Sequence, residues 1–284
     1  MDPNPSLGLI WRLQQGAHVA VYALALYGGA NIARQVWAQP TPPAHAYLPS
    51  AVRMAQVTAT EQLDMEQRLS ALEQLLVPLS RDGDDLYLTG VNLHVVNGTG
   101  RTDAPPNGKG NIIIGYNELR GGTDLDGTPA DQRTGSHYLV AGRGNNYRGF
   151  GGAVIGSSND SAGEYAVSLG GQGNIAAGDF ALTVGGTQNR AHGPGAITVG
   201  GNENQASGFM CLTIGGEGNG CSGDWSAVLG GEGNRTGSDA RSATVTGGQM
   251  NTVQTEIGSI SGGAKVELVG RVPAAWAAGD LRWP

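Results

Sequence analysis

The chain has 284 residues, of which 49 are glycine, and this share of about 17% is more than twice the usual roughly 7%. Such a composition disfavours a mostly helical fold, and 13 prolines without glycine at every third position exclude collagen. A hydrophobic share of 39% argues against disorder of the whole chain, while 6% aromatic residues disfavour the large buried pocket of an ordinary enzyme. The net charge of −7 removes the electrostatic basis for binding nucleic acid.

Residues 1–38 carry the features of a targeting or anchoring segment. An apolar run from Ala17 to Ala30 precedes Val36-Trp37-Ala38, whose Val36 and Ala38 satisfy the small-residue rule at a signal-peptidase site. A cleaved signal peptide is therefore predicted. A retained membrane-anchor helix and a helix that docks onto an assembly partner are the alternatives, because Arg34 lies between the apolar run and the cleavage site. A Pro-rich linker is expected at 39–50.

A short coiled coil is expected over residues 51–80, followed by a neck at 81–104. Polar residues fill most of the positions between the a and d sites, and Pro78 is expected to end the helix. Only the last two heptads are strongly apolar, so association needs help from the following segment; the alternative is one amphipathic helix packed on its own domain. The a sites are Ala55, Gln62, Leu69 and Leu76, and the d sites are Thr58, Met65, Leu72 and Leu79.

A 15-residue repeat occupies residues 105–265. Each unit contains a short strand, a glycine pair, two variable residues, an asparagine and a stretch of small residues that ends in glycine. The glycine pairs end at Gly171, Gly186, Gly201, Gly216 and Gly231, and the asparagines are Asn159, Asn174, Asn189, Asn204, Asn219 and Asn234. Such a unit has a contour of roughly 50 Å, enough for two short strands and two corners. We therefore expect a mainly β fold, a parallel β-roll or β-solenoid with one coil per repeat.

Within each coil, the first strand alternates between two kinds of side chain. Leu182 and Val184 share one face, whereas Ala181 and Thr183 share the other, and the second strand adds a column of small residues such as Ala191. Small residues allow the two strands to approach closely. The asparagines are expected to form a structural ladder, with side-chain amide hydrogen bonds between coils, and the corner glycines to supply positive φ.

A coil of this kind buries little apolar area, so self-association is expected to complete the core. At this point the repeat resembles the head domain of trimeric autotransporter adhesins, the YadA-like family of Gram-negative surface proteins. The resemblance is carried by three Asn-x-Ala-x-Gly stretches, at 174–178, 189–193 and 204–208, each followed by an alternating strand. It implies a homotrimer for about residues 105–265. The family's C-terminal membrane β-barrel segment is not recognised, and the expected coiled coil precedes the roll instead of following it, so the autotransport mechanism is not implied.

Residues 118–136 form an insertion between two repeats, and insertions in a solenoid often carry binding function. Asp124, Asp126 and Asp131 are the loop contacts that we single out there, with loose cation binding as one role and a plain solvated turn as the preferred one. Cys211 and Cys221 are interpreted as small core residues, and a bridge between them requires that their strands face each other. No catalytic residue, metal site or cofactor is predicted.

The sequence thus predicts a non-enzymatic structural or adhesive protein that presents a trimeric β-roll on a bacterial surface or outside the cell, with a C-terminal cap or tail at 266–284. Its partners are other copies of the chain and an unidentified surface receptor or glycan. A phage or injection-machine fibre, on a virion, fits the same layout. A solenoid enzyme that cleaves polysaccharides is the second alternative, with Glu203, Glu217 and Glu232 as its candidate acids.

Overall fold

The computed structural model describes residues 50–121, 131–270, 274–279 and 281–283. The expected signal or anchor segment, the linker up to residue 49 and residues 122–130 of the 118–136 insertion lie outside these residues. The chain divides into two compact units between Val91 and Asn92, within the expected neck. Each unit is described by itself.

The first unit contains helix α2 (Ser50–Leu76) and a hairpin of β1 (Leu79–Asp82) and β2 (Asp85–Leu88). The helix ends at Leu76, four residues before the end of the segment expected to form a coiled coil. Leu79, expected at a d site, pairs with Leu88 in the hairpin instead. Pro78 is the physical reason, because proline cannot continue the helical hydrogen bonds. Met65, Leu69, Leu72 and Leu76 are exposed along the described part of the helix.

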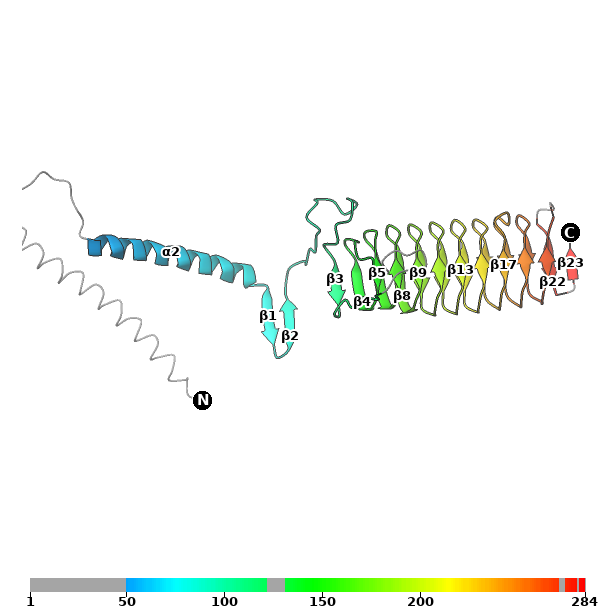
Figure 1. The fold of residues 1–284 in the computed structure, drawn as a ribbon, viewed down its shortest axis with the longest axis horizontal. Coiled ribbons are helices and arrows are strands. Elements are labelled where there is room, and N and C mark those ends of the chain that lie inside the picture. The colour runs from blue at the N-terminus through cyan, green and yellow to red at the C-terminus, as the bar shows by residue number, and fades with distance from the viewer. Residues whose placement is uncertain (1–49, 122–130, 271–273, 280, 284) are drawn as a thin grey trace, which may run out of the picture. The chain divides into compact units, whose positions relative to one another are not determined.

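The second unit is a parallel β-solenoid of about nine turns of about 15 residues, as the repeat predicts. Figure 1 shows its strands stacked as successive rungs. Within the described residues the first sheet consists of β3 (Ile112–Ile114), β4 (Leu139–Arg143), β6 (Ala153–Ser157), β8 (Val167–Gln172), β10 (Leu182–Val184), β12 (Ile197–Val199), β14 (Leu212–Ile214), β16 (Ala227–Val228), β18 (Thr244–Val245), β20 (Ser259–Ile260), β22 (Trp276–Ala278) and β23 (Leu281–Trp283).

The second sheet lies on the other side of each coil. It consists of β5 (Asn146–Tyr147), β7 (Asp160–Ser161), β9 (Ile175–Ala176), β11 (Arg190–Ala191), β13 (Gln205–Ala206), β15 (Gly220–Cys221), β17 (Arg235–Thr236), β19 (Thr252–Val253) and β21 (Glu267–Leu268).

Successive coils stack in register. Leu182 pairs with Ile197 and Ile197 with Leu212, so each step along the sheet is one repeat. The solenoid continues past residue 265, where the sequence places a cap: β21 extends the second sheet and β22 the first. The repeat is hard to recognise there because its glycine and asparagine signals have faded. β23 then pairs antiparallel with β22, joining Trp276 to Trp283, and covers the open edge of the first sheet.

The core between the two sheets is built from small side chains in the coils from β8 to β14. Ala176, Ala191 and Ala206 of the second sheet are completely buried, and so are Thr183 and Thr198 of the first. In these coils the larger aliphatic residues of the first sheet point the other way, so the alternation read from the sequence is confirmed, with the small face inside. Toward the two ends of the solenoid the inward positions hold larger residues, such as Val154, Val228 and Ile260, which are completely buried.

The asparagine column is buried, and each of its side chains hydrogen-bonds its own coil to the next one. The Asn189 side-chain oxygen accepts from the Asn204 backbone N–H at 3.0 Å, and its Nδ2 donates to the carbonyls of Gly185 and Gly201 at 3.3 and 3.1 Å. The expected amide bonds between coils are thus bonds from side chain to backbone. The column also includes Asn145 and Asn251, which lie 14 residues before Asn159 and 17 after Asn234. At these two residues the spacing differs from the 15-residue repeat.

At some corners, large residues adopt the left-handed backbone conformation that favours glycine. Gly186 has φ of 70°, as expected of a corner glycine, but Tyr165 and Phe180 have φ of 55° and 59°. That conformation costs a residue with a side chain roughly 1–2 kcal/mol. The rings of Tyr165 and Phe180 stack with centroids 5.3 Å apart, and Phe150 packs edge-on against Tyr165 at 5.1 Å. Aromatic pairs contribute about 0.5–1.5 kcal/mol each, which offsets most of the cost.

Cys211 and Cys221 form a disulfide across the core of one coil, with their Cα atoms 6.0 Å apart. Both residues are completely buried, as predicted, but the preference for unbridged cysteines is wrong. The strands β14 and β15 face each other there, which is the condition the bridge requires. In the neighbouring coils the same two columns hold alanines such as Ala196 and Ala206.

We predict that Asn189→Ala lowers the free energy of unfolding by about 2–4 kcal/mol, because it leaves the buried Asn204 N–H without its partner and removes one of the two donors to the Gly201 carbonyl. Urea denaturation followed by circular dichroism measures the change. Thr187→Ala, an exposed substitution in the same coil, is the control and is expected to shift stability by less than about 0.5 kcal/mol. Equal effects of the two substitutions would show that the ladder is not what holds the coils.

We also predict that the double variant Cys211→Ala, Cys221→Ala still folds, since alanine fits both columns, and that it loses about 2–3 kcal/mol of stability with the short closed loop opened. Mass spectrometry of the denatured wild type after alkylation, with and without reductant, checks the bridge. Two alkylated cysteines without reductant would refute it.

Candidate functional site

The outer face of the first sheet is apolar over seven coils. We name it the aliphatic stripe, and its members are Leu139, Ile155, Val167, Leu169, Leu182, Val184, Ile197, Val199, Leu212, Ile214 and Leu229. At about 4.8 Å for each step between coils, it is about 29 Å long. Its side chains are half-buried or exposed in the single chain, with Leu169 37% and Leu229 40% exposed.

The stripe ends abruptly toward the C-terminus. The next two coils carry Thr244 and Thr246, then Ser259 and Ser261, at the same outward positions. Trp276 follows, and its indole N–H donates to the Ser261 hydroxyl at 3.0 Å. The first sheet therefore changes from an apolar to a polar outer face after β16, although the backbone register continues without a break.

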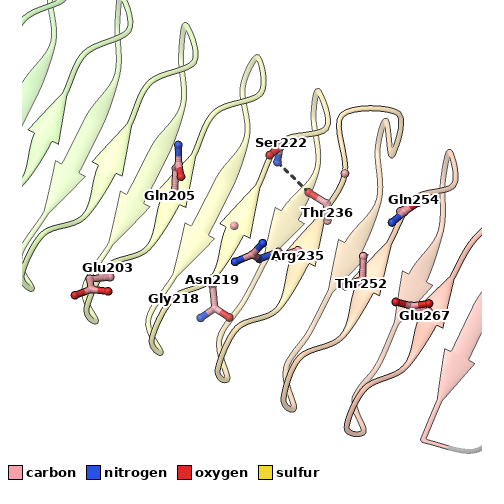
Figure 2. A pocket seen from close by; sticks show the side chains of 12 residues that line it. Glu203, Gln205, Gly218, Asn219, Ser222, Arg235, Thr236, Thr252, Gln254 and Glu267 are labelled. Atoms are coloured by element: carbon pink, nitrogen blue, oxygen red, sulfur yellow. Dashed lines mark hydrogen bonds between the residues drawn. The ribbon is translucent and has the colours of Figure 1, made fainter. Parts of the chain in front are cut away.

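The outer face of the second sheet is polar and contains a hollow of about 610 Å³. We name it the outer groove. Figure 2 shows side chains from successive coils along it, and Ser222 N–H donating to the Thr236 hydroxyl at 3.2 Å. The side chains that characterise it are Glu203, Gln205, Ser222, Arg235, Thr252, Gln254 and Glu267. A smaller hollow of about 240 Å³ adjoins it at Glu203 and Gln205 and adds Gln188 and Arg190.

The outer groove exists because one residue lacks a side chain. Gly220 stands in the column that holds Arg190, Gln205, Arg235 and Thr252 in the neighbouring coils. Its backbone lies within the sheet, where its N–H donates to the Asn234 carbonyl at 2.8 Å, so the floor of the groove is an intact strand. A glycine that interrupts a column of long side chains is the sequence signal that would have located the groove.

The lining of the outer groove offers both donors and acceptors of hydrogen bonds. Arg235 lies near the middle, with Glu203 and Glu267 toward the two ends, and amides and hydroxyls between them. The named side chains include no large apolar anchor of the kind that dominates protein–protein interfaces. This chemistry suits a ligand rich in hydroxyl groups.

The aspartates singled out in the insertion are only partly described. Asp124 and Asp126 lie outside the described residues. Both carboxylate oxygens of Asp131 accept backbone hydrogen bonds, from Arg120 N–H at 2.7 Å and from Gly121 N–H at 2.9 Å, and the Arg133 guanidinium lies 3.4 Å away. Asp131 thus fastens the base of the loop.

The candidate acids of a polysaccharide-cleaving enzyme lie on exposed turns. Glu217 and Glu232 are paired across adjacent coils, and Glu232 accepts from the Gln249 amide at 3.0 Å. Glu203 lies apart from them in the outer groove. In the part of the chain that the structure describes, no group of three or more acids, histidines or cysteines is placed to hold a metal ion.

No protein-family model and no curated protein matches the chain. Among the residues with described structure, no helix has both the length and the apolar character that crossing a membrane requires.

We predict that Gly220→Gln fills the outer groove without harm to the fold. The backbone at Gly220 is not left-handed, and an added Cβ would meet only Arg235 Cγ at 3.6 Å, an ordinary contact. Replacing a strand glycine is expected to raise stability by about 0.5–1 kcal/mol. Thermal denaturation tests this, and a fall of more than about 1 kcal/mol would show that glycine is needed for the fold and not for the hollow.

Proposed function

We propose that the protein is a non-enzymatic structural or adhesive rod, a homotrimer whose chains cover one another's aliphatic stripes and present the outer groove to a surface receptor or glycan. The observation that carries the proposal is the opposite character of the two outer faces: apolar on the first sheet, polar on the second. In the coils from β8 to β14, a core of small side chains supplies little apolar burial of its own, so covering the stripe adds stability that one chain lacks.

The size of the stripe supports self-association. Monomeric proteins rarely expose a contiguous apolar patch larger than a few hundred Å², and a larger patch marks an interaction surface. A row of aliphatic residues repeated at each coil matches another copy of itself under rotational symmetry, since every chain offers the same spacing. We propose three chains, and not another number, because the repeat resembles the heads of trimeric adhesins.

The exposed apolar residues of helix α2 support the same assembly. Met65, Leu69, Leu72 and Leu76 occupy a and d sites and are exposed in the single chain. In a trimer these residues pack together as a short coiled coil that sets the register of the chains. Two weak association elements in one chain strengthen each other, because assembly of one raises the local concentration of the other.

The disulfide favours an oxidising location. Bridges such as Cys211–Cys221 persist outside the cell or in the periplasm and are rare in the cytosol. We therefore propose that the rod acts at a bacterial surface or outside the cell, with a fibre of a phage or injection machine as the alternative use of the same parts.

Multi-angle light scattering of the full chain tests the assembly. The expected mass is three times that of one chain. Leu182→Asp places a charge in the middle of the stripe, outside the core, and is expected to shift the mass toward one chain.

Arg190→Asp, in the same coil but on the outer face of the second sheet, is the matched control and is expected to remain trimeric. A wild-type mass of one chain would overturn the proposal.

A further inference from the structure

The repeat is lengthened by two residues in two coils near its C-terminal end, and the second of these appears as the 17-residue step from Ser259 to Trp276. The first lengthening lies just after Asn234. The asparagine ladder advances by 15 residues in each of the four steps from Asn174 to Asn234, and then by 17 to Asn251. Pairing resumes on both sides of the insertion, Cys221 with Thr236 and Ala227 with Thr244. The two extra residues therefore fall at the corner between β17 and β18.

The extra residues Ser238 and Asp239 border a hollow of about 530 Å³, which we name the corner hollow. It also includes Asp224, Arg241, Thr255 and Glu256. Gln254 belongs both to the corner hollow and to the outer groove, so the two hollows adjoin.

Contacts outside the corner hollow hold two of its charged groups in place. The Arg241 guanidinium carbon lies 4.3 Å above the centre of the Trp225 ring, and Trp225 packs edge-on against Phe209 at 5.4 Å. One oxygen of Asp224 accepts from the Phe209 backbone N–H at 2.9 Å. A binding site whose groups are held before the ligand arrives loses less entropy on binding.

The charges narrow the class of ligand. Asp224, Asp239 and Glu256 outnumber Arg241, which disfavours phosphate, sulfate and other anions. Within the described residues these carboxylates do not gather closely enough to hold a metal ion. The lining has no apolar anchor for a protein partner. A sugar hydroxyl both donates and accepts hydrogen bonds. It can therefore donate to the carboxylates of the hollow and accept from its guanidinium and its amide.

We propose that the corner hollow binds a terminal sugar that is uncharged or carries an amino group, while the outer groove holds the following residues of the same saccharide. This rests on the adhesive role proposed above and gives that role a ligand class. Ser238 and Asp239, the two residues that regular coils lack, contribute part of the lining of the corner hollow, together with Gly270 from the corner before β22.

The test is a deletion that restores the regular coil. The full chain lacking Ser238 and Asp239 has the 15-residue spacing of its neighbours and is expected to fold. Binding is measured on an array of neutral, amino-substituted, sialylated and sulfated oligosaccharides. The wild type is expected to bind neutral or amino-substituted glycans, and the deletion to weaken binding about tenfold or more.

Asp239→Asn, which preserves side-chain size, and Arg241→Gln, which shortens the side chain and removes its charge, are expected to weaken binding in the same way. They keep the test valid if the deletion variant does not fold. Glu164→Ala is the matched control, an exposed acid at the equivalent corner of an earlier coil, and is expected to bind as the wild type does.

Three results would overturn the proposal: no glycan bound by the wild type, binding restricted to sialylated or sulfated glycans, or equal binding by all the variants. Light scattering on the same samples separates this failure from that of the assembly, since a trimer that binds no sugar refutes only the ligand.

Discussion

The in-register stacking of one short coil on the next is the constraint on which the rest of the structure depends. The regular coils carry the same kinds of residue at the same positions. Each has an asparagine inside one corner, a small residue in the second strand and an aliphatic pair on the outer face of the first. The Asn189 bonds to Gly185, Gly201 and Asn204 show how one side chain joins its own coil to the next. In the coils from β8 to β14, the consequence of this repetition is a core made of small side chains.

In these coils the larger aliphatic residues lie outside because successive side chains of a strand point to opposite faces. With Ala181 and Thr183 on the inner face, Leu182 and Val184 lie on the outer one and belong to the aliphatic stripe. Function then divides between the two outer faces. The stripe is suited to other copies of the chain, whereas the outer groove and the corner hollow, with their charged and amide groups, are suited to a ligand that stays partly hydrated.

Much of the solenoid could be predicted from the sequence, because a fixed period states where each side chain returns. The period predicted the strands, their parallel register and the inward small face. It did not predict the ends of the ladder at Asn145 and Asn251, where coil lengths of 14 and 17 residues break the spacing. The hairpin after Pro78 was missed because its apolar residues continue the heptad pattern. The disulfide depends on which strands face each other, and that is a property of three-dimensional packing.

The site was less predictable than the fold for a related reason. The sequence points to the insertion at 118–136 as a binding loop, but the Asp131 carboxylate hydrogen-bonds to backbone at the base of that loop and has a structural role there. The hollows instead lie at a missing side chain, at Gly220, and beside two added residues, Ser238 and Asp239. Small departures from a regular repeat matter because every neighbouring coil is regular.

The central claim, that other copies of the chain cover the aliphatic stripe, is tested most directly by hydroxyl-radical footprinting of the full chain. Our account predicts that Leu182, Ile197 and Leu212 are protected from oxidation in solution, although they are partly exposed in a single chain. It also predicts that oxidation of these three residues rises when dilution dissociates the assembly into single chains. Oxidation of the stripe at the rate expected for the single chain, whatever the concentration, would contradict it.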